Sequence, residues 1–178
     1  MRTIRQAEVS DIDGIKALLK KYHKDTISDE DRPNGFVTTA ISDEKLKKLI
    51  SEEDGVTIIA DVDKVLGFCF AAPWEFWEEW PLFRHMMDII PKYSFEGKPL
   101  VLEETYQYGP MCIDSSIRGT GAFEELFFAS LSKFKDRFDG VNLLWSFCLT
   151  PVFCRCAHLH PARDVAHPEC ALTDQIVA

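Results

Sequence analysis

A glycine-rich turn between two strand-like runs constrains the fold of this chain more than any other feature. The turn is residues 117–122 (IRGTGA). After it, six apolar residues recur at helical spacing, and Asp139-Gly140 follows as a stop signal. These residues are Phe123, Leu126, Phe127, Leu131, Phe134 and Phe138. Residues 101–113 before the turn and 141–149 after the helix are predicted strands, so the pattern predicts an α/β (α+β) domain.

Glycine and proline interrupt the strand before the turn. Gly109-Pro110 cannot continue a regular central ladder, because proline has no N–H donor and glycine weakens pairing. We therefore expect a bulge or a splay at this point of the sheet. Glu104, Tyr106 and Tyr108 are expected to share one face of the same strand.

The other elements follow from their periodicity. Strands are predicted at 3–7, 56–61 and 65–72, the last two as a hairpin, and helices at 12–22 and 42–50. Ser42 is in position to cap the second of these helices. Residues 73–100 form an insert with Trp74, Trp77 and Trp80 at helical spacing. These aromatic residues either pack on the sheet or line a substrate pocket.

Length and composition favour one domain, in which residues 151–178 are an atypical tail to a body of residues 1–150. The chain has 178 residues, of which 46% are hydrophobic and 28% charged. Its formal charge of −9 repels phosphate backbones, so no nucleic acid is expected as a partner. The longest uncharged apolar run, residues 141–154, is too short to span a bilayer. Six cysteines without an export signal predict reduced thiols in a cytoplasmic protein.

The turn itself is a candidate anion site. A glycine-rich turn at the start of a helix lets backbone N–H groups approach a phosphate, and the helix dipole favours the negative charge. The pattern is neither the dinucleotide fingerprint nor the Walker motif. A turn that only starts the helix is the structural alternative.

From residue 3 to about residue 149, the chain resembles the GNAT superfamily of acetyl-CoA-dependent N-acetyltransferases. Residues 3–12 (TIRQAEVSDI) are similar to its opening strand and first helix. The hairpin at residues 56–72, which contains VLGFCF, is similar to its second and third strands. Arg118 and Gly121 match the first and fourth positions of its signature, Arg/Gln-x-x-Gly-x-Gly/Ala. Phe123 departs from the sixth position, where its ring would either crowd a cofactor or turn inward onto the sheet. The resemblance implies a mixed, mostly antiparallel sheet, flanked by helices and splayed between its fourth and fifth strands.

The resemblance also implies a function and a cosubstrate. The expected activity is transfer of an acetyl group from acetyl-CoA to a primary amine on a small molecule or a peptide. Backbone groups would hold the pantetheine arm at Met111, Cys112 and Ile113, and the pyrophosphate at Arg118, Gly119, Thr120, Gly121, Ala122 and Phe123. Glu104 is the expected general base and His158 the expected general acid. Dimers are common in this family, which leaves a monomer and a homodimer both open.

Two other functions compete with the acetyltransferase interpretation. A non-catalytic module that binds acyl-CoA or a partner would explain Phe123 and the unusual tail. A zinc-dependent regulator would use the cysteines and histidines of the tail, Cys154, Cys156, His158, His160, His167 and Cys170. Because their spacing differs from that of known zinc loops, no metal ligand is assigned.

Overall fold

The computed structural model describes residues 2–62, 64–95, 97–138, 140–143 and 152–155. The chain divides into two compact units. The first contains Met1–Ala71 and Gly109–Lys133, and the second contains Ala72–Tyr108 and Phe134–Ala178. The predicted boundary between body and tail at residue 150 lies outside the described residues and stays a prediction.

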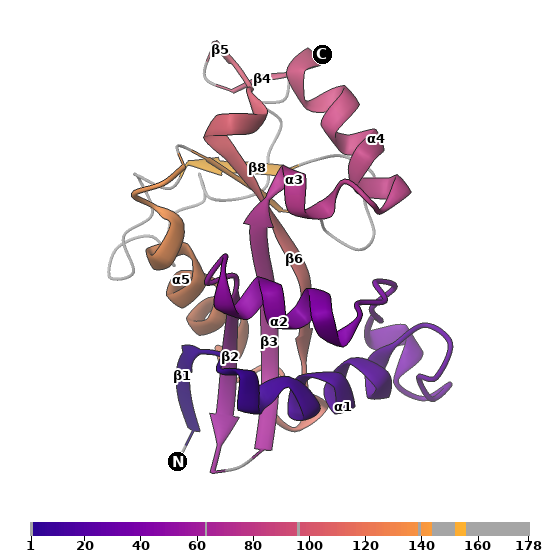
Figure 1. The fold of residues 1–178 in the computed structure, drawn as a ribbon. Helices are drawn as coiled ribbons and strands as arrows, with labels where there is room; N and C mark the ends of the chain where they lie inside the picture. Colours follow the sequence, from indigo (N-terminus) through magenta and orange to yellow (C-terminus); the bar gives the residue numbers. More distant parts are fainter. Residues whose placement is uncertain (1, 63, 96, 139, 144–151, 156–178) are drawn as a thin grey trace. The chain divides into compact units, whose positions relative to one another are not determined.

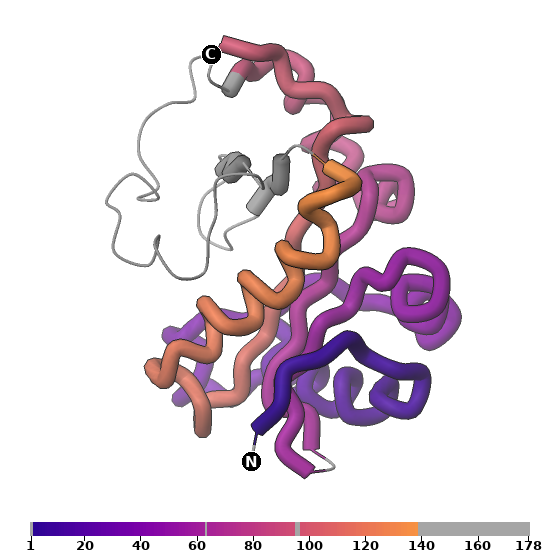
Figure 2. The backbone as a smooth tube through the Cα atoms, turned by 90° about the vertical axis from the view of Figure 1, so that its left-hand side faces the viewer, coloured from indigo at the N-terminus to yellow at the C-terminus, as the bar shows by residue number. Residues whose placement is uncertain are grey.

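The first unit is built on a hairpin and the strand that precedes it. β2 (Val56–Asp61) pairs antiparallel with β1 (Arg2–Gln6) and with β3 (Lys64–Pro73). The helices α1 (Ile12–Tyr22) and α2 (Asp43–Ser51) lie on one side of these strands, and α5 (Ala122–Phe134) lies on the other (Figures 1 and 2). The predicted strands, hairpin and first two helices are therefore confirmed.

The helices of the first unit bury the faces that their periodicity predicts. In α1, the buried residues recur at helical spacing as Ile15, Leu18, Leu19 and Tyr22. In α2, the buried residues are Leu46, Leu49 and Ile50, and the Ser42 side chain accepts a hydrogen bond from the Lys45 N–H at 3.2 Å. A 3₁₀ turn, Arg32–Asn34, interrupts the polar segment between the two helices. These helices therefore depend on tertiary burial more than on intrinsic propensity.

The second unit contains the tryptophan-rich insert. Its elements are α3 (Trp74–Trp77), α4 (Pro81–Ile89), the 3₁₀ turn Ile90–Lys92, and the short strands β4 (Ser94–Phe95) and β5 (Lys98–Pro99), which pair antiparallel. Trp74 donates its indole N–H to the Thr105 hydroxyl at 3.0 Å, and Trp77 packs against Phe83 with ring centroids 5.0 Å apart. Both indoles are almost fully buried, which agrees with a packing role.

The strand order is β1-β2-β3-β6-β7-β8, which makes the sheet mixed and mostly antiparallel. β6 (Thr105–Ile113) pairs in parallel with β7 (Gly140–Leu143), and β7 pairs antiparallel with β8 (Val152–Arg155). The sequence analysis did not predict β8. The described β6–β7 register ends at Tyr108–Leu143, directly before the cis Gly109-Pro110 bond. Because residues 144–151 are outside the described part, the splay stays a prediction.

Two predicted boundaries are wrong. Leu102–Glu104 form a 3₁₀ turn, so β6 begins at Thr105 and not at residue 101. The Thr105 hydroxyl donates to the Val101 carbonyl at 3.0 Å, which holds this turn in place of a strand. The helix after the glycine turn ends at Phe134 and not at Phe138, because the N–H groups of residues 137 and 138 both bond to the Phe134 carbonyl and tighten the chain into a turn.

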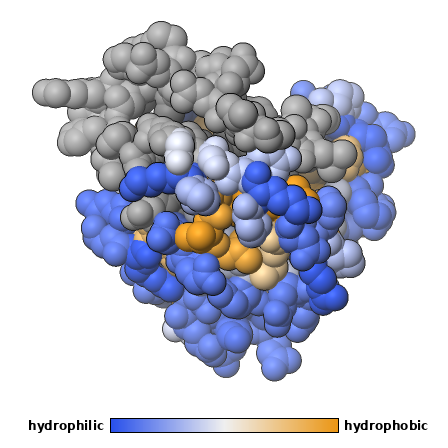
Figure 3. All heavy atoms as spheres, turned by 90° about the horizontal axis from the view of Figure 1, so that it is seen from above, coloured by the Kyte–Doolittle hydropathy of each residue, from blue (hydrophilic) through white to orange (hydrophobic). Residues whose placement is uncertain are grey.

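The surface agrees with the composition. In the view of Figure 3, hydrophilic residues surround a smaller apolar area. Among the described residues, no helix has the length and apolar character needed to cross a bilayer. Within the described residues, Cys69 and Cys112 are not disulfide-bonded and both side chains are buried, as expected for cysteines within apolar runs.

Replacing Ser42 with alanine should lower the free energy of unfolding by about 1 kcal/mol, because the Lys45 N–H loses its side-chain acceptor. Urea unfolding followed by circular dichroism measures this change. Ser42→Gly is the matched control, and it should cost only a few tenths of a kcal/mol. Equal losses in the two variants would contradict the capping role.

Candidate functional site

The glycine turn joins the end of β6 to the start of α5 within the first unit. Ser115–Ile117 form a 3₁₀ turn, and α5 begins at Ala122. Gly119 has φ +72° and Gly121 has φ +80°, a conformation that residues with a side chain rarely adopt. In the described part of the chain, no atom beyond the adjacent residues lies within 4 Å of the point where a Cβ would stand at either glycine. Backbone conformation therefore requires both glycines, and no side chain of the described residues fills the space above them.

The start of α5 directly follows the two glycines and brings backbone N–H groups next to the turn. The N–H groups of Ala122, Phe123 and Glu124 belong to the first turn of α5, where no helix carbonyl lies four residues before them. The first N–H to bond within the helix is that of Glu125, to the Gly121 carbonyl at 3.1 Å. The positive end of the helix dipole lies at the same place. This combination of donors and field suits an anion such as a phosphate.

Phe123 does not close the open space. Its ring stacks on Phe127, one helical turn further along α5, with the two planes 3° apart and the centroids separated by 6.3 Å. The side chain is half-buried. Since no Phe123 atom lies within 4 Å of a Cβ at Gly119 or Gly121, crowding at the glycines is not observed. The ring lies along the helix, an arrangement that the sequence analysis did not anticipate.

Arg118 directs its guanidinium toward the base of the turn. Nε donates to the Ile113 carbonyl at 2.9 Å, and one terminal nitrogen donates to the Asn34 carbonyl at 3.3 Å. The guanidinium carbon lies 4.8 Å from the centre of the Tyr22 ring. Arg118 therefore supports the turn with its side chain, while its backbone continues into the glycine segment.

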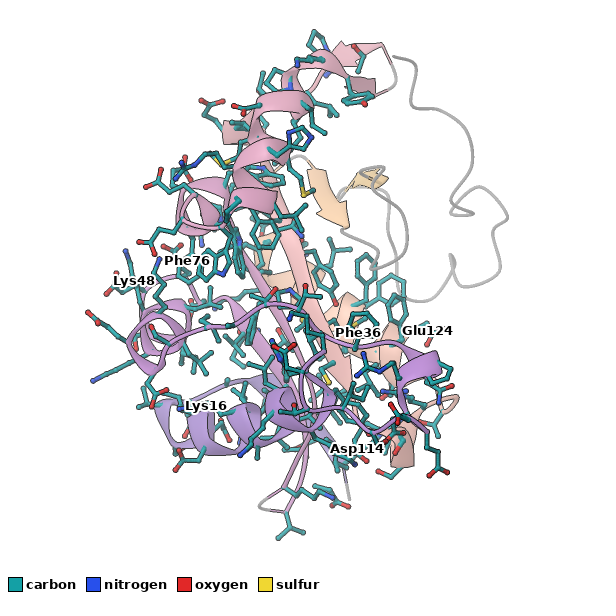
Figure 4. The ribbon with its side chains drawn as sticks, turned by 90° about the vertical axis from the view of Figure 1, so that its right-hand side faces the viewer. Lys16, Phe36, Lys48, Phe76, Asp114 and Glu124 are labelled. Carbon is teal, nitrogen blue, oxygen red and sulfur yellow. The ribbon has the colours of Figure 1, made fainter. Side chains whose placement is uncertain are left out.

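Asp114 is a buried carboxylate that the sequence analysis missed. It accepts hydrogen bonds from the Ser116 N–H at 3.1 Å, the Ser116 hydroxyl at 2.7 Å and Lys21 Nζ at 2.8 Å. Burial alone would raise the pKa of Asp114, but hydrogen bonds from Lys21 and Ser116 outweigh it and hold the pKa well below its usual range. Asp114 and Glu124, labelled in Figure 4, lie before and after the turn in the chain. Asp-Ser-Ser before a glycine turn is a local capping signal that could have identified it.

A second ion pair supports the turn from the sheet edge. Arg2 in β1 donates to the Thr120 hydroxyl at 2.6 Å and to both carboxylate oxygens of Glu125 at 2.7 and 2.8 Å. The Thr120 hydroxyl donates in turn to the Ile117 carbonyl at 2.7 Å. Thr120 is thus held both by its side chain and by its carbonyl, which accepts a hydrogen bond from Arg2 at 3.3 Å.

The residues predicted to hold a pantetheine arm precede the turn on β6. Met111 and Ile113 are half-buried and Cys112 is buried. Burial raises the pKa of the Cys112 thiol to about 12, although the nearby Arg118 guanidinium acts in the opposite direction. Cys112 is therefore a neutral packing residue at neutral pH, because a nucleophilic cysteine requires the thiolate.

Of the two predicted catalytic residues, Glu104 lies within the described part of the chain and His158 does not. Glu104 is exposed and ends the 3₁₀ turn before β6 in the second unit. The prediction that Glu104 shares a strand face with Tyr106 and Tyr108 is wrong, because the strand begins after it and both tyrosines are buried. His158 lies outside the described residues, as does most of the cysteine- and histidine-rich tail. Within the described residues, no group of three or more histidine, cysteine or carboxylate side chains is arranged to hold a metal.

Comparison with known proteins identifies the fold through structure and not through sequence. No family model matches the sequence, and no curated protein gives a significant match to it. A GCN5-related N-acetyltransferase from Kribbella flavida aligns with 82% of this chain at a TM-score of 0.53 and 8% identity. N-acetylglutamate synthase from Neisseria gonorrhoeae, complexed with coenzyme A and N-acetyl-glutamate, aligns with 83% at a TM-score of 0.51 and 16% identity.

The alignments cover 30% and 26% of those two longer proteins. A GNAT family acetyltransferase from Brucella melitensis in complex with acetyl-CoA aligns over 83% of this chain and 77% of its own length, at a TM-score of 0.49 and 16% identity. The protein therefore has the fold of the GNAT acetyltransferases, as the resemblance in the sequence implied.

The charge on Asp114 should make stability depend on pH. Since the folded pKa of Asp114 lies below the unfolded value of about 3.9, its contribution is fully present above that value and is lost as pH falls through the folded pKa. Asp114→Asn should therefore lower the free energy of unfolding at pH 7 by about 1–3 kcal/mol. The difference from wild type should shrink below about pH 4.

Denaturant unfolding at pH 7, 5 and 3 measures this difference. Asp29→Asn, at a fully exposed carboxylate, is the control and should change the unfolding free energy little at any of the three pH values. A difference for Asp114→Asn that stays constant from pH 7 to pH 3 would show that its charge does not stabilise the fold.

Proposed function

We propose that this protein transfers an acetyl group from acetyl-CoA to a primary amine, with the pyrophosphate bound on the turn from Arg118 to Phe123. The observation that carries the proposal is the open glycine turn at the start of α5, in a chain with the GNAT fold. The similar N-acetylglutamate synthase from Neisseria gonorrhoeae is complexed with coenzyme A, which supports the same class of ligand here.

The backbone supplies the binding groups in this proposal. N–H groups of the turn and of the first turn of α5 hold the pyrophosphate oxygens at normal hydrogen-bond distances, about 3 Å. Backbone groups of Met111, Cys112 and Ile113 hold the pantetheine arm in the manner of an added strand. Acetyl-CoA acts as a cosubstrate and needs no covalent link to the protein.

The chemistry is a direct transfer. A base first takes one proton from the ammonium group and passes it to solvent. The neutral amine nitrogen then attacks the thioester carbonyl carbon, the carbon–sulfur bond breaks, and the nitrogen releases a second proton, which balances the one that the thiolate takes up. A backbone N–H stabilises the carbonyl oxygen as it becomes negative. The departing thiolate takes a proton from an acid, for which His158 is proposed. An acetylated Cys112 is not part of the route, because its raised pKa keeps the thiol protonated.

Glu104 is the proposed base. Its exposed position lets it reach solvent and release the proton it has accepted. The acidic formal charge of −9 favours the approach of a cationic amine, either a small molecule or a peptide. The deprotonated amine then reacts, since an ammonium group has no free electron pair.

Gly121→Val should abolish acetyl-CoA binding, weakening it by at least about 100-fold, because the side chain would occupy the space that the phosphate oxygens need. The strained φ should also cost the fold about 1–2 kcal/mol. Isothermal titration with acetyl-CoA on the folded proteins measures binding.

Gly97→Val is the matched control for this titration. Gly97 has φ +77°, close to that of Gly121, and lies in the β4–β5 turn of the second unit. It should show the same strain and unchanged binding. Equal binding by wild type and Gly121→Val would place the pyrophosphate elsewhere, and a wild type that does not bind would remove the acetyltransferase proposal.

Glu104→Gln should lower kcat by about 10²–10⁴-fold while acetyl-CoA affinity is retained, because the variant loses the base and no phosphate contact. Acetyl-CoA-dependent thiol release against a panel of small-molecule and peptide amines measures the rate. Glu103→Gln, at the adjacent exposed carboxylate, is the control and should keep the wild-type rate. Equal rates for both variants across pH would exclude Glu104, and binding without thiol release in wild type would indicate a non-catalytic acyl-CoA-binding module.

A further inference from the structure

Side chains from the C-terminal end of α1 contact residues 114–118, the segment that leads from β6 into the glycine turn. We propose that Tyr22, the Lys21–Asp114 ion pair and the Arg118 guanidinium form a positioning network that keeps the turn in its phosphate-binding shape. None of these side chains needs to touch the ligand. The inference rests on the proposed function, because it names the residues that prepare that same site.

Tyr22 is the centre of the network. Its side chain is 1% exposed, and its hydroxyl oxygen accepts a hydrogen bond from the Ser115 N–H at 2.8 Å. Ser115 is the first residue of the 3₁₀ turn after β6, and its N–H has no partner within that turn. Tyr22 therefore fixes the point at which the chain leaves the sheet and enters the turn.

Asp114 fixes the next donor. Its carboxylate accepts from the N–H and the hydroxyl of Ser116, while Lys21 Nζ neutralises the charge at 2.8 Å. Asp114 is also tied to the sheet, because its own N–H donates to the Leu66 carbonyl at 2.8 Å. The N–H groups of Ser115 and Ser116 are thus both bonded to side chains, and those of Ile117 and Arg118 donate to the Asp114 and Ser115 carbonyls at 3.1 and 3.4 Å. The donors proposed for the ligand therefore lie beyond Arg118 in the turn.

Arg118 holds the far end of the same turn. Its guanidinium joins the Ile113 carbonyl to the Asn34 carbonyl and lies over the Tyr22 ring. Nε bonds to a residue five positions earlier, so the chain between them closes into a compact loop. Because its guanidinium is already bonded to two backbone carbonyls, we assign Arg118 to positioning the turn and not to binding phosphate.

The energetic consequence follows from preorganisation. Several N–H groups must converge on the pyrophosphate at about 3 Å, so a turn that samples other shapes binds only during the fraction of time in which they converge. The apparent dissociation constant rises in inverse proportion to that fraction. Loosening the base of the turn should therefore weaken acetyl-CoA binding without changing the rate of the bound complex.

Tyr22→Phe tests this directly, because it removes one oxygen and keeps the ring under Arg118. The KM and dissociation constant for acetyl-CoA should rise about tenfold, the equivalent of one lost hydrogen bond of about 1.4 kcal/mol. At saturating acetyl-CoA, kcat should be unchanged. Ser42→Ala is the matched control, since it loses about as much stability at the remote cap of α2 and should leave KM at the wild-type value.

Lys21 provides a second test that does not depend on Tyr22. Lys21→Met should raise KM several-fold, and Lys21→Arg should restore it, because an arginine can still pair with Asp114. This variant also keeps the inference testable if Tyr22→Phe does not fold. Titration of each folded variant with acetyl-CoA, followed by steady-state kinetics, gives the division between KM and kcat.

The possible outcomes separate the two proposals. If wild type binds acetyl-CoA and both Tyr22→Phe and Lys21→Met bind equally well, the positioning network is wrong and the proposed function stands. If Ser42→Ala raises KM as much as Tyr22→Phe, general loss of stability explains the effect and the network is again wrong. If wild type does not bind acetyl-CoA, the proposed function falls and this inference falls with it.

Discussion

The hydrogen bond from the Asp114 N–H to the Leu66 carbonyl joins the end of β6 to β3, and the candidate site depends on this attachment. Beyond it the chain leaves the sheet, and its next donors are taken by buried side chains and no longer by a neighbouring strand. A turn that must carry two glycines with positive φ has no regular hydrogen-bond ladder to hold it. Side chains from α1 and β1 therefore supply the constraint that secondary structure cannot.

In this arrangement, charged side chains support the turn, and backbone groups are proposed to bind the ligand. Arg2, Lys21 and Arg118 are cations beside the turn, and each is bonded to the protein itself: to Glu125, to Asp114 and to two backbone carbonyls, respectively. Backbone N–H groups at the start of α5 are the groups proposed to bind a ligand. Binding through backbone donors is suited to a pyrophosphate, because their positions are fixed by the fold and not by flexible side chains.

The chemistry proposed for the site depends on the protonated thiol of Cys112 and on the exposed position of Glu104. The buried Cys112 thiol is protonated at neutral pH, so the chain offers no activated cysteine at this strand and a direct transfer between thioester and amine is the simpler route. Glu104 is exposed and belongs to a 3₁₀ turn, which places the proposed base before the strand and not on it. Phe123 stacks along α5, so its departure from the GNAT signature does not fill the space over the glycines.

The sequence by itself determined the elements whose signals are local: the amphipathic face of α1, the Ser42 cap of α2, the β2–β3 hairpin and the glycine turn before α5. Each of these elements depends on residues that are close together in the sequence, so each could be predicted from the local pattern. The start of β6 was predicted too early, because Leu102–Glu104 form a 3₁₀ turn that both backbone bonds and the Thr105 hydroxyl hold. Only the tertiary structure decided that Lys21 pairs with Asp114, 93 residues away, and that Arg118 turns back to Asn34. Such partners depend on how helices pack on the sheet, and no local periodicity encodes which distant side chains that packing brings together.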